Sequence, residues 1–409
     1  MSYKNRSVTE SIHYLLNNFP AVAVLGARQV GKSTLLQNIF PNAVFFDLER
    51  DADFQRINDD PALLLQETER PIVFDEAQLS PSLFRALRVA IDQQRQQTGQ
   101  FLLSGSSSPQ LLKQISETLA GRVAIVELDP LSWHEIMTEN SHSDFLISAL
   151  ENPQRLGQLK ARLDKKELLN LCLYGGYPEP VLKRQDKKFF RLWMENYLKT
   201  YVERDIRALF PQLNIDAYKR FVQMLAFASG EIINASKFAR SLDVSQPTIK
   251  HYLEIIEGTF LWRQIPSYQK NIRKRLVKMP KGHLRDTGLI NYFLRLHNEN
   301  DMKAHPQFGQ IWEIFITEQI IRHFKNNLES VEYYYYRTQN KAEVDLVLET
   351  SYGLIPIEIK AGSVTSKRQI RSLEQFIKEH NCRYGLVVNN GDEVYKLSDK
   401  VYQVPAIFL

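Results

Sequence analysis

Short apolar runs separated by amphipathic stretches dominate the first 130 residues of the chain. Runs such as AVAVL at 21–25 lack the alternation of a half-exposed strand, and they predict strands that are buried on both faces. The expected strands cover residues 21–25, 43–48, 72–74, 101–103 and 123–128. Amphipathic segments at 33–40 and 82–97 predict helices between them. This alternation favours an α/β fold with a mostly parallel sheet covered on both faces.

The pattern changes twice further along the chain. Residues from about 132 to 264 read as almost entirely helical, and β-type runs return at 331–337, 344–349 and 355–360. A helix near 367–379 and a strand near 384–388 complete a second α/β unit. We therefore expect four parts, covering residues 1–130, 131–225, 226–285 and 286–409.

The composition is that of an ordinary folded protein. The chain has 409 residues, and its 52 basic and 47 acidic side chains leave a formal net charge of +5. With 17 Gly and 17 Pro, this composition excludes a collagen-like or wholly disordered chain. The two cysteines, Cys172 and Cys382, lack the spacing of a disulfide framework or a zinc site. No apolar run approaches the ~20 residues of a spanning helix and the N-terminus has no signal-peptide pattern, so we expect a cytoplasmic protein without a membrane partner.

A phosphate-binding motif follows the first expected strand. The segment GARQVGKS at 26–33 matches GxxxxGK[ST] without a mismatch, between an expected strand and an expected helix. Backbone N–H groups of such a loop wrap phosphate oxygens, and the helix N-terminus favours the anion. Lys32 would reach the β- and γ-phosphates, and Ser33 would hold Mg²⁺. The expected nucleotide-binding residues are Gly26, Ala27, Arg28, Gln29, Val30, Gly31, Lys32, Ser33 and Thr34.

Two carboxylates follow the third expected strand, in PIVFDE at 71–76. Asp75 would hold Mg²⁺, and Glu76 would orient and polarise the attacking water. An acidic helix cap is the alternative for the pair alone. The phosphate-binding motif about 45 residues upstream favours the catalytic interpretation.

Further side chains are candidates for the γ-phosphate end of this site. Ser104 and Ser106 follow the strand FLL and could contact phosphate or water; we favour Ser106, although both also suit a helix cap. Arg122 could neutralise transition-state charge, and Arg28 competes for that role. A surface turn is the alternative for Arg122. Because the sequence has no intact NKxD string, ATP is favoured over GTP.

These segments resemble a known group of proteins. GARQVGKSTLL, VFDEAQ, LSGSSS and LAGRVAIVELDPLSWHEI are similar to the signatures of prokaryotic AAA-like ATPases, members of the AAA superfamily that carry a C-terminal domain of unknown function. The segments LVKMPKGHLRDTGLINYFL, EVDLVLE and PIEIKAG resemble that C-terminal domain. The resemblance implies an AAA-like domain over 1–130 that binds ATP and Mg²⁺ and hydrolyses ATP. An arginine from a neighbouring copy often completes such sites, which implies a homo-oligomer.

Residues 226–285 predict a winged-helix-like module, after a helical connector at 131–225. A helix at 236–242, a short turn and a second helix at about 246–257 would lead into a hairpin over 260–268. The second helix would enter a DNA major groove, with Lys250 and His251 as its polar readers. The alternative is a module that packs or contacts protein.

A basic stretch at 270–285 carries seven cations and no acidic residue. Nucleic-acid phosphates are the natural partner of such a stretch, and a solvated strand face is the alternative. The cations are Lys270, Arg273, Lys274, Arg275, Lys278, Lys281 and Arg285.

Charged residues also recur in two of the C-terminal strands. Asp345 lies in VDLVL, and Glu358 and Lys360 lie in IPIEIK. Positions two apart on a strand share a face, so Glu358 and Lys360 project together, and strand pairing would bring Asp345 beside them. The carboxylates would hold Mg²⁺ while the lysine positions water for phosphodiester attack. A hairpin with ordinary exposed charges is the alternative.

With Glu313 on the preceding helix, this set resembles the PD-(D/E)xK nuclease pattern, although Val344 stands where proline is usual. Glu343 is an alternative ligand. The resemblance implies a restriction-endonuclease-like domain over 286–409. Two functions follow: an ATPase that acts on DNA, or an ATP-gated regulatory or binding protein whose nuclease-like domain is catalytically silent.

Overall fold

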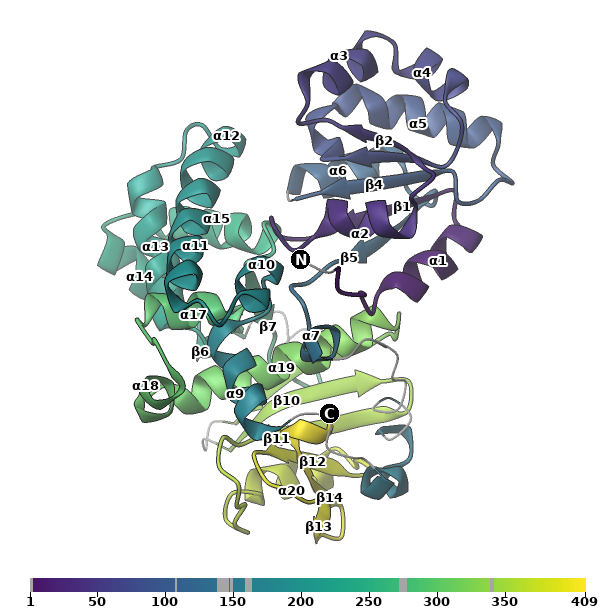
Figure 1. The fold of residues 1–409 in the computed structure, drawn as a ribbon. Helices are drawn as coiled ribbons and strands as arrows, with labels where there is room; N and C mark the ends of the chain where they lie inside the picture. The colour runs from purple at the N-terminus through teal and green to yellow at the C-terminus, as the bar shows by residue number, and fades with distance from the viewer. Residues whose placement is uncertain are drawn as a thin grey trace. The chain divides into compact units, whose positions relative to one another are not determined.

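The structure is a computed structural model that describes residues 3–106, 109–137, 147, 150–158, 164–271, 278–338 and 342–409. The chain divides into two compact units (Figure 1), which are Ser2–Leu131 with Glu254–Leu261, and Ser132–Leu253 with Trp262–Leu409. No helix among the described residues combines the length and apolar character needed to cross a bilayer.

A five-stranded parallel sheet forms the centre of the first unit, in the order β2-β3-β4-β1-β5. The strands are β1 (Ala21–Leu25), β2 (Val44–Asp47), β3 (Ile72–Asp75), β4 (Phe101–Gly105) and β5 (Val123–Glu127). Each lies within two residues of its expected bounds, and the predicted parallel sheet is confirmed. Strands β1, β3 and β4 are buried throughout, as their continuous apolar runs require.

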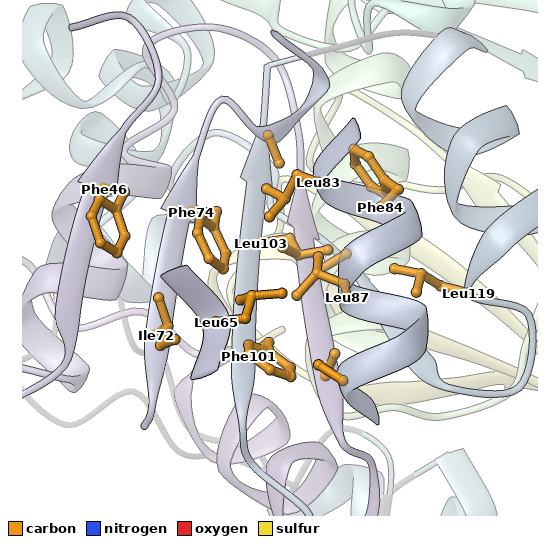
Figure 2. Close-up of a cluster of buried hydrophobic side chains, with 14 of the residues drawn as sticks. Phe46, Leu65, Ile72, Phe74, Leu83, Phe84, Leu87, Phe101, Leu103 and Leu119 are labelled. Carbon is orange, nitrogen blue, oxygen red and sulfur yellow. The ribbon is translucent and has the colours of Figure 1, made fainter. Parts of the chain in front are cut away.

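Helices cover this sheet and complete its core. Helix α5 presents Leu83 and Leu87 to the sheet at a spacing of four residues, and Figure 2 shows them beside Phe74, Phe101 and Leu103. The helices of the unit are α1 (Thr9–Asn18), α2 (Lys32–Ile39), α3 (Asp51–Asp59), α4 (Pro61–Glu67), the 3₁₀ turn η1 (Ala77–Leu79), α5 (Pro81–Gln93) and α6 (Pro109–Thr118).

The second unit begins with a run of helices. Near the middle of this run, a π-helical turn η3 (Tyr201–Ile206) interrupts the helical segment between α11 and α12. The other elements are α7 (Trp133–Met137), η2 (Pro153–Gln158), α9 (Lys165–Tyr174), α10 (Pro178–Leu182), α11 (Lys187–Thr200), α12 (Arg207–Leu209), α13 (Ile215–Phe227), α14 (Ala235–Leu242) and α15 (Gln246–Gly258). Helix α15 runs from the second unit into the segment assigned to the first.

A small antiparallel sheet, ordered β6-β8-β7, follows these helices. Its strands are β6 (Glu231–Ile232), β7 (Trp262–Ile265) and β8 (Lys281–Leu284). The expected hairpin within 260–268 is wrong, because β7 pairs with β8 instead. Strand β7 ends before Pro266, which has no N–H to donate to a sheet. Two residues later, Tyr268 N donates a hydrogen bond to the carbonyl oxygen of Tyr335 at 2.6 Å.

A six-stranded mixed sheet, ordered β13-β14-β12-β11-β10-β9, ends the chain. Its strands are β9 (Glu332–Arg337), β10 (Glu343–Thr350), β11 (Gly353–Ile359), β12 (Gly385–Asn389), β13 (Tyr395–Ser398) and β14 (Val401–Pro405). Helix α20 (Arg371–Glu379) packs Leu373, Phe376 and Ile377 onto the sheet. Helices α17 (Thr287–Phe293), α18 (Glu299–Ala304) and α19 (Phe308–Asn326) precede it.

Candidate functional site

The candidate site lies at the carboxyl-terminal edge of the first sheet. Because all five strands are parallel, the segments that follow β1, β3 and β4 meet at this edge. These segments carry residues 26–33, 75–76 and 104–106. The fold therefore brings the three expected groups of site residues together.

Two glycines of the β1–α2 loop are required by its backbone. A Cβ on Gly26 would lie 2.2 Å from the carbonyl oxygen of Leu128, so no larger residue fits. Gly31, the residue before α2, has φ 95°, a conformation that costs glycine little. Such a loop can bring its N–H groups close to a phosphate.

Lys32 begins α2 and folds back over the loop. Its Nζ donates to the carbonyl oxygens of Gly26 at 3.1 Å and Ala27 at 3.0 Å, and the residue is 5% exposed. Burial lowers the pKa of Lys32, and the carboxylates of Glu76 and Asp75 oppose that shift. The ammonium group is thus held beside the loop where phosphate oxygens would lie.

Asp75 ends β3 and is tied to two hydroxyl groups. Ser104 on the neighbouring strand β4 donates to its carboxylate, and Ser33 of the loop also hydrogen-bonds to it. Burial raises the pKa of Asp75, against these hydrogen bonds. A hydroxyl and a carboxylate are oxygen ligands of the kind that Mg²⁺ prefers, so Ser33 and Asp75 fit the expected metal position.

Glu76 is held by three hydrogen bonds to one oxygen. Its Oε2 accepts from Ser106 N at 3.0 Å, Ser106 Oγ at 2.7 Å and Gln78 Nε2 at 2.5 Å. Its backbone is left-handed, with φ 53°, a conformation that costs a non-glycine residue energy. Burial pushes the pKa of Glu76 upward, but Lys32, Gln78 and Ser106 together bring it below its ordinary value. The carboxylate is therefore ionised at neutral pH and fixed in place.

The two candidate serines contact different carboxylates. Ser104 donates to Asp75, and Ser106 donates to Glu76. The favoured residue, Ser106, thus lies beside the proposed water-orienting group, while Ser104 lies beside the proposed metal ligand.

The two arginine candidates are placed differently. Arg28 lies in the loop and pairs with Glu49. Arg122 precedes β5, and the first residue of β5, Val123, pairs in register with Ala21 at the start of β1. The phosphate-binding loop follows the other end of β1, about five residues or roughly 16 Å away along the strand. Arg122 forms a two-pronged pair with Asp92 at 2.8 and 2.9 Å. The assignment of Arg122 to this chain's own phosphate site is therefore corrected.

One supporting residue escaped the sequence-based prediction. The buried Arg6 donates from Nη1 to the carbonyl oxygen of Val30 in the loop at 2.9 Å, and from Nη2 to that of Asp129 at 2.6 Å. It thereby joins the loop to the segment after β5. No motif marks this residue, since it lies twenty positions before the loop.

A second charged cluster lies in the C-terminal sheet. Strands β10 and β11 pair antiparallel, and their register places Asp345 across from Glu358. Asp345 Oδ2 accepts from Ile359 N at 2.8 Å and lies 3.7 Å from Lys360 Nζ, which also pairs with Glu358. The structure thus brings together the three expected residues of these strands.

Glu313 of α19 joins this cluster, but through an unexpected partner. Lys281 of β8 pairs with Glu313 Oε1 at 2.5 Å and lies 3.6 Å from Glu343 Oε1. Burial and the nearby Asp345 raise the pKa of Glu313 to about 7, against the pull of Lys281. Burial and Asp345 likewise raise the pKa of Glu358 to about 8, against Lys360. Among the residues that the structure describes, no three His, Cys, Asp or Glu side chains are arranged to hold a metal ion.

The basic stretch at 270–285 does not form one exposed face. Lys281 and Arg285 are buried, and Lys278 donates to the carbonyl oxygen of Arg337. Arg273, Lys274 and Arg275 lie outside the described residues. For Lys281 and Arg285, both the predicted contact with nucleic-acid phosphates and the alternative of a solvated strand face are corrected, because the two residues are buried.

Comparison with known families agrees with this description of the first unit. Residues 18–137 match a family described as an AAA domain. Residues 165–300 and 308–408 match two families described as domains of unknown function. The phosphate-binding loop and the acidic strand end of the first sheet both lie within the residues that match the AAA domain.

Whole-length relatives define the family more closely. Uncharacterized proteins of Mycobacterium tuberculosis and Mycobacterium bovis are each 32% identical over 408 residues, 99% of this chain and 84% of theirs. An uncharacterized protein of Methanocaldococcus jannaschii is 23% identical over 75% of this chain and 66% of its own. The chain belongs to the same family as the two mycobacterial proteins.

Solved structures also include similar chains. A Walker-type ATPase of Pyrococcus abyssi is 17% identical and matches 72% of this chain and 96% of its own, with a TM-score of 0.43. The RuvB Holliday junction branch migration motor of Thermotoga maritima is 18% identical and matches 64% of this chain and 90% of its own, with a TM-score of 0.32.

Proposed function

We propose that this protein is a Mg²⁺-dependent ATPase that acts on DNA through its middle and C-terminal parts. One observation carries the enzymatic half of the proposal. Lys32, Asp75 and Glu76 converge at a single sheet edge, and hydrogen bonds from Ser33, Ser104 and Ser106 fix the two carboxylates.

The arrangement suits phosphoryl transfer to water. The loop and Lys32 would bind the phosphates, while Ser33 and Asp75 would hold Mg²⁺, which supplies charge neutralisation at the phosphate oxygens when bound. Glu76, ionised and fixed by Ser106, would orient the attacking water and accept its proton.

Completion of this site by a second copy is part of the proposal. In its own chain, Arg122 lies at the end of the sheet opposite to the phosphate-binding loop, and its side chain is 20% exposed. We infer a homo-oligomer in which an arginine from a neighbour approaches the γ-phosphate. Both cysteines, Cys172 and Cys382, are free thiols, which supports a reducing cytoplasm as the location.

The DNA-directed half of the proposal rests on the second unit. Helices α14 and α15, followed by the β7–β8 pair, have the order typical of a winged helix. Lys250 and His251 are exposed on α15, where they could read base edges. The helix α19 and strands β9–β12 have the order that we expect of a nuclease-like domain over 286–409.

A second candidate function is favoured by Lys281. Its ammonium group lies among the carboxylates that a nuclease would need for Mg²⁺. This favours an ATP-gated regulatory protein that binds DNA or another partner and whose nuclease-like domain is catalytically silent.

Cleavage of plasmid and branched DNA with Mg²⁺ or Mn²⁺ separates the two candidates. Cleavage that is lost in both Glu358→Ala and Lys360→Ala, yet retained in Glu76→Gln, would establish a nuclease. DNA binding without cleavage on any substrate would support the regulatory function. The absence of both binding and cleavage would reject action on DNA.

A further inference from the structure

Lys281 enters the C-terminal carboxylate cluster from a different sheet. It begins β8, where it pairs in register with Ile265 of β7 and Ile232 of β6. The side chain of Lys281 is 9% exposed. Its Nζ pairs with Glu313 Oε1 and lies 3.6 Å from Glu343 Oε1. A residue of the small antiparallel sheet thus neutralises acidic groups on α19 and β10.

A second lysine compensates the rest of the cluster. Lys360 pairs with Glu358 and lies 3.7 Å from Asp345. Arg337 also approaches Glu343, at 3.9 Å. Within the part of the chain that the structure describes, three cationic side chains thus face the four carboxylates.

One carboxylate oxygen is left unsatisfied. Glu358 is 7% exposed, and its buried Oε2 has no hydrogen-bond partner among the residues that the structure describes. Its other oxygen, Oε1, pairs with Lys360. A buried carboxylate oxygen without a partner is costly, so the cluster retains an acceptor that suits a cation.

An ammonium group and a divalent cation compete for such oxygens. A divalent ion that bound Glu313 and its neighbours would have to displace Lys281 or lie against its charge, and the repulsion is large where water is scarce. The backbone of Lys281 is held in a paired strand, which fixes the position from which its side chain reaches the carboxylates.

We propose that Lys281 takes the place of a divalent cation in this cluster and holds the cluster closed to metal. The inference rests on the nuclease-like site of the proposed function, and it adds that Lys281 controls whether metal can bind there. Strand β8 is then an internal inhibitor of metal binding, and the acidic ligands are intact but occupied by an ammonium group.

Binding of Mn²⁺ to the full-length protein, without nucleotide, tests this inference. Electron paramagnetic resonance of free Mn²⁺ provides the measurement, and Asp75→Asn in every sample removes the metal ligand of the ATPase site. We expect no bound Mn²⁺ in the parent and one bound Mn²⁺ per chain in Lys281→Ala at the same concentrations, because the competing ammonium charge is gone. Adding Glu358→Gln to Lys281→Ala should abolish that binding, and Lys281→Arg should leave the cluster closed.

Two results would overturn the inference. Mn²⁺ bound by the parent and lost in Glu358→Gln would show that Lys281 does not exclude metal. A folded Lys281→Ala protein that binds no Mn²⁺ would show that the cluster is not a latent metal site. If Lys281→Ala does not fold, the parent and Lys281→Gln carry the same comparison. Phosphate release from ATP, measured on protein with Asp75 intact, reports separately on the proposed ATPase.

Discussion

Glu76 combines a left-handed backbone with a carboxylate oxygen that accepts three hydrogen bonds. The strained conformation of a non-glycine residue persists only where its surroundings hold it. Here Ser106 and Gln78 do so, and they leave the other oxygen of Glu76 for water. The residue is therefore oriented for a role in hydrolysis.

We expect Glu76→Gln to bind ATP normally and to hydrolyse it more slowly, by roughly 10²-fold or more, because the amide cannot accept a proton from water. Stopped-flow phosphate release and equilibrium nucleotide binding measure the two effects. Gln78→Ala is the matched control, because it removes a hydrogen bond to Glu76 but keeps the carboxylate, and its loss should be smaller. A near-normal turnover in Glu76→Gln would assign the water to another residue.

Among single residues, the sequence motifs predicted which candidate site residues lie together, but not the residues that support them. Lys32, Asp75 and Glu76 follow strands whose parallel order could be inferred, so their convergence was predictable. Arg6 and Lys281 act through contacts between segments that are distant in the sequence, 24 residues from Arg6 to Val30 and 32 from Lys281 to Glu313. Neither contact leaves a local pattern.

Among the elements, α17 is fixed at its start by a buried carboxylate. Asp286 caps the helix by accepting from Leu289 N at 3.2 Å and also accepts from Gly176 N, after α9, at 2.7 Å. A Cβ on Gly175 would lie 2.2 Å from Asp286 Oδ1, so the turn after α9 requires glycine there. One side chain thus joins two helices that are more than a hundred residues apart in the sequence.

Loss of this cap should destabilise the second unit. Asp286→Ala removes the acceptor and leaves buried N–H groups without a partner, which should cost about 2–4 kcal/mol. Asp164→Ala is the matched control, since this exposed residue caps α9 through Lys166 N alone, and it should cost about 1 kcal/mol. Thermal unfolding followed by circular dichroism compares them; equal losses would contradict the bridging role of Asp286.

Some strands could be predicted from the sequence pattern and others could not. Continuous apolar runs predicted β1 to β5, and further β-type runs predicted β9 to β12. Strands β13 and β14 were missed, since β13 is largely exposed and carries no apolar run. The hairpin expected at 260–268 failed because its second strand, β8, is contributed by residues beyond 280.

At the scale of the whole molecule, the chain joins a unit that carries an AAA domain to a second unit with its own charged cluster. The formal net charge of +5 counts buried and exposed cations alike, so it does not show that Lys281 and Arg285 are buried. Together, the phosphate-binding loop of the first unit and the lysine-filled carboxylate cluster of the second favour the proposed regulatory protein over one that cleaves DNA constitutively.

The central claim is that the N-terminal site binds and hydrolyses ATP. Phosphate release from Mg²⁺-ATP by the full-length protein, with and without DNA, tests it most directly when nucleotide affinity is measured alongside. We predict turnover by the wild type, and weakened nucleotide binding with loss of turnover in Lys32→Ala, because the ammonium group would contact the phosphates. No phosphate release under either condition, together with unchanged nucleotide affinity in Lys32→Ala, would contradict the account.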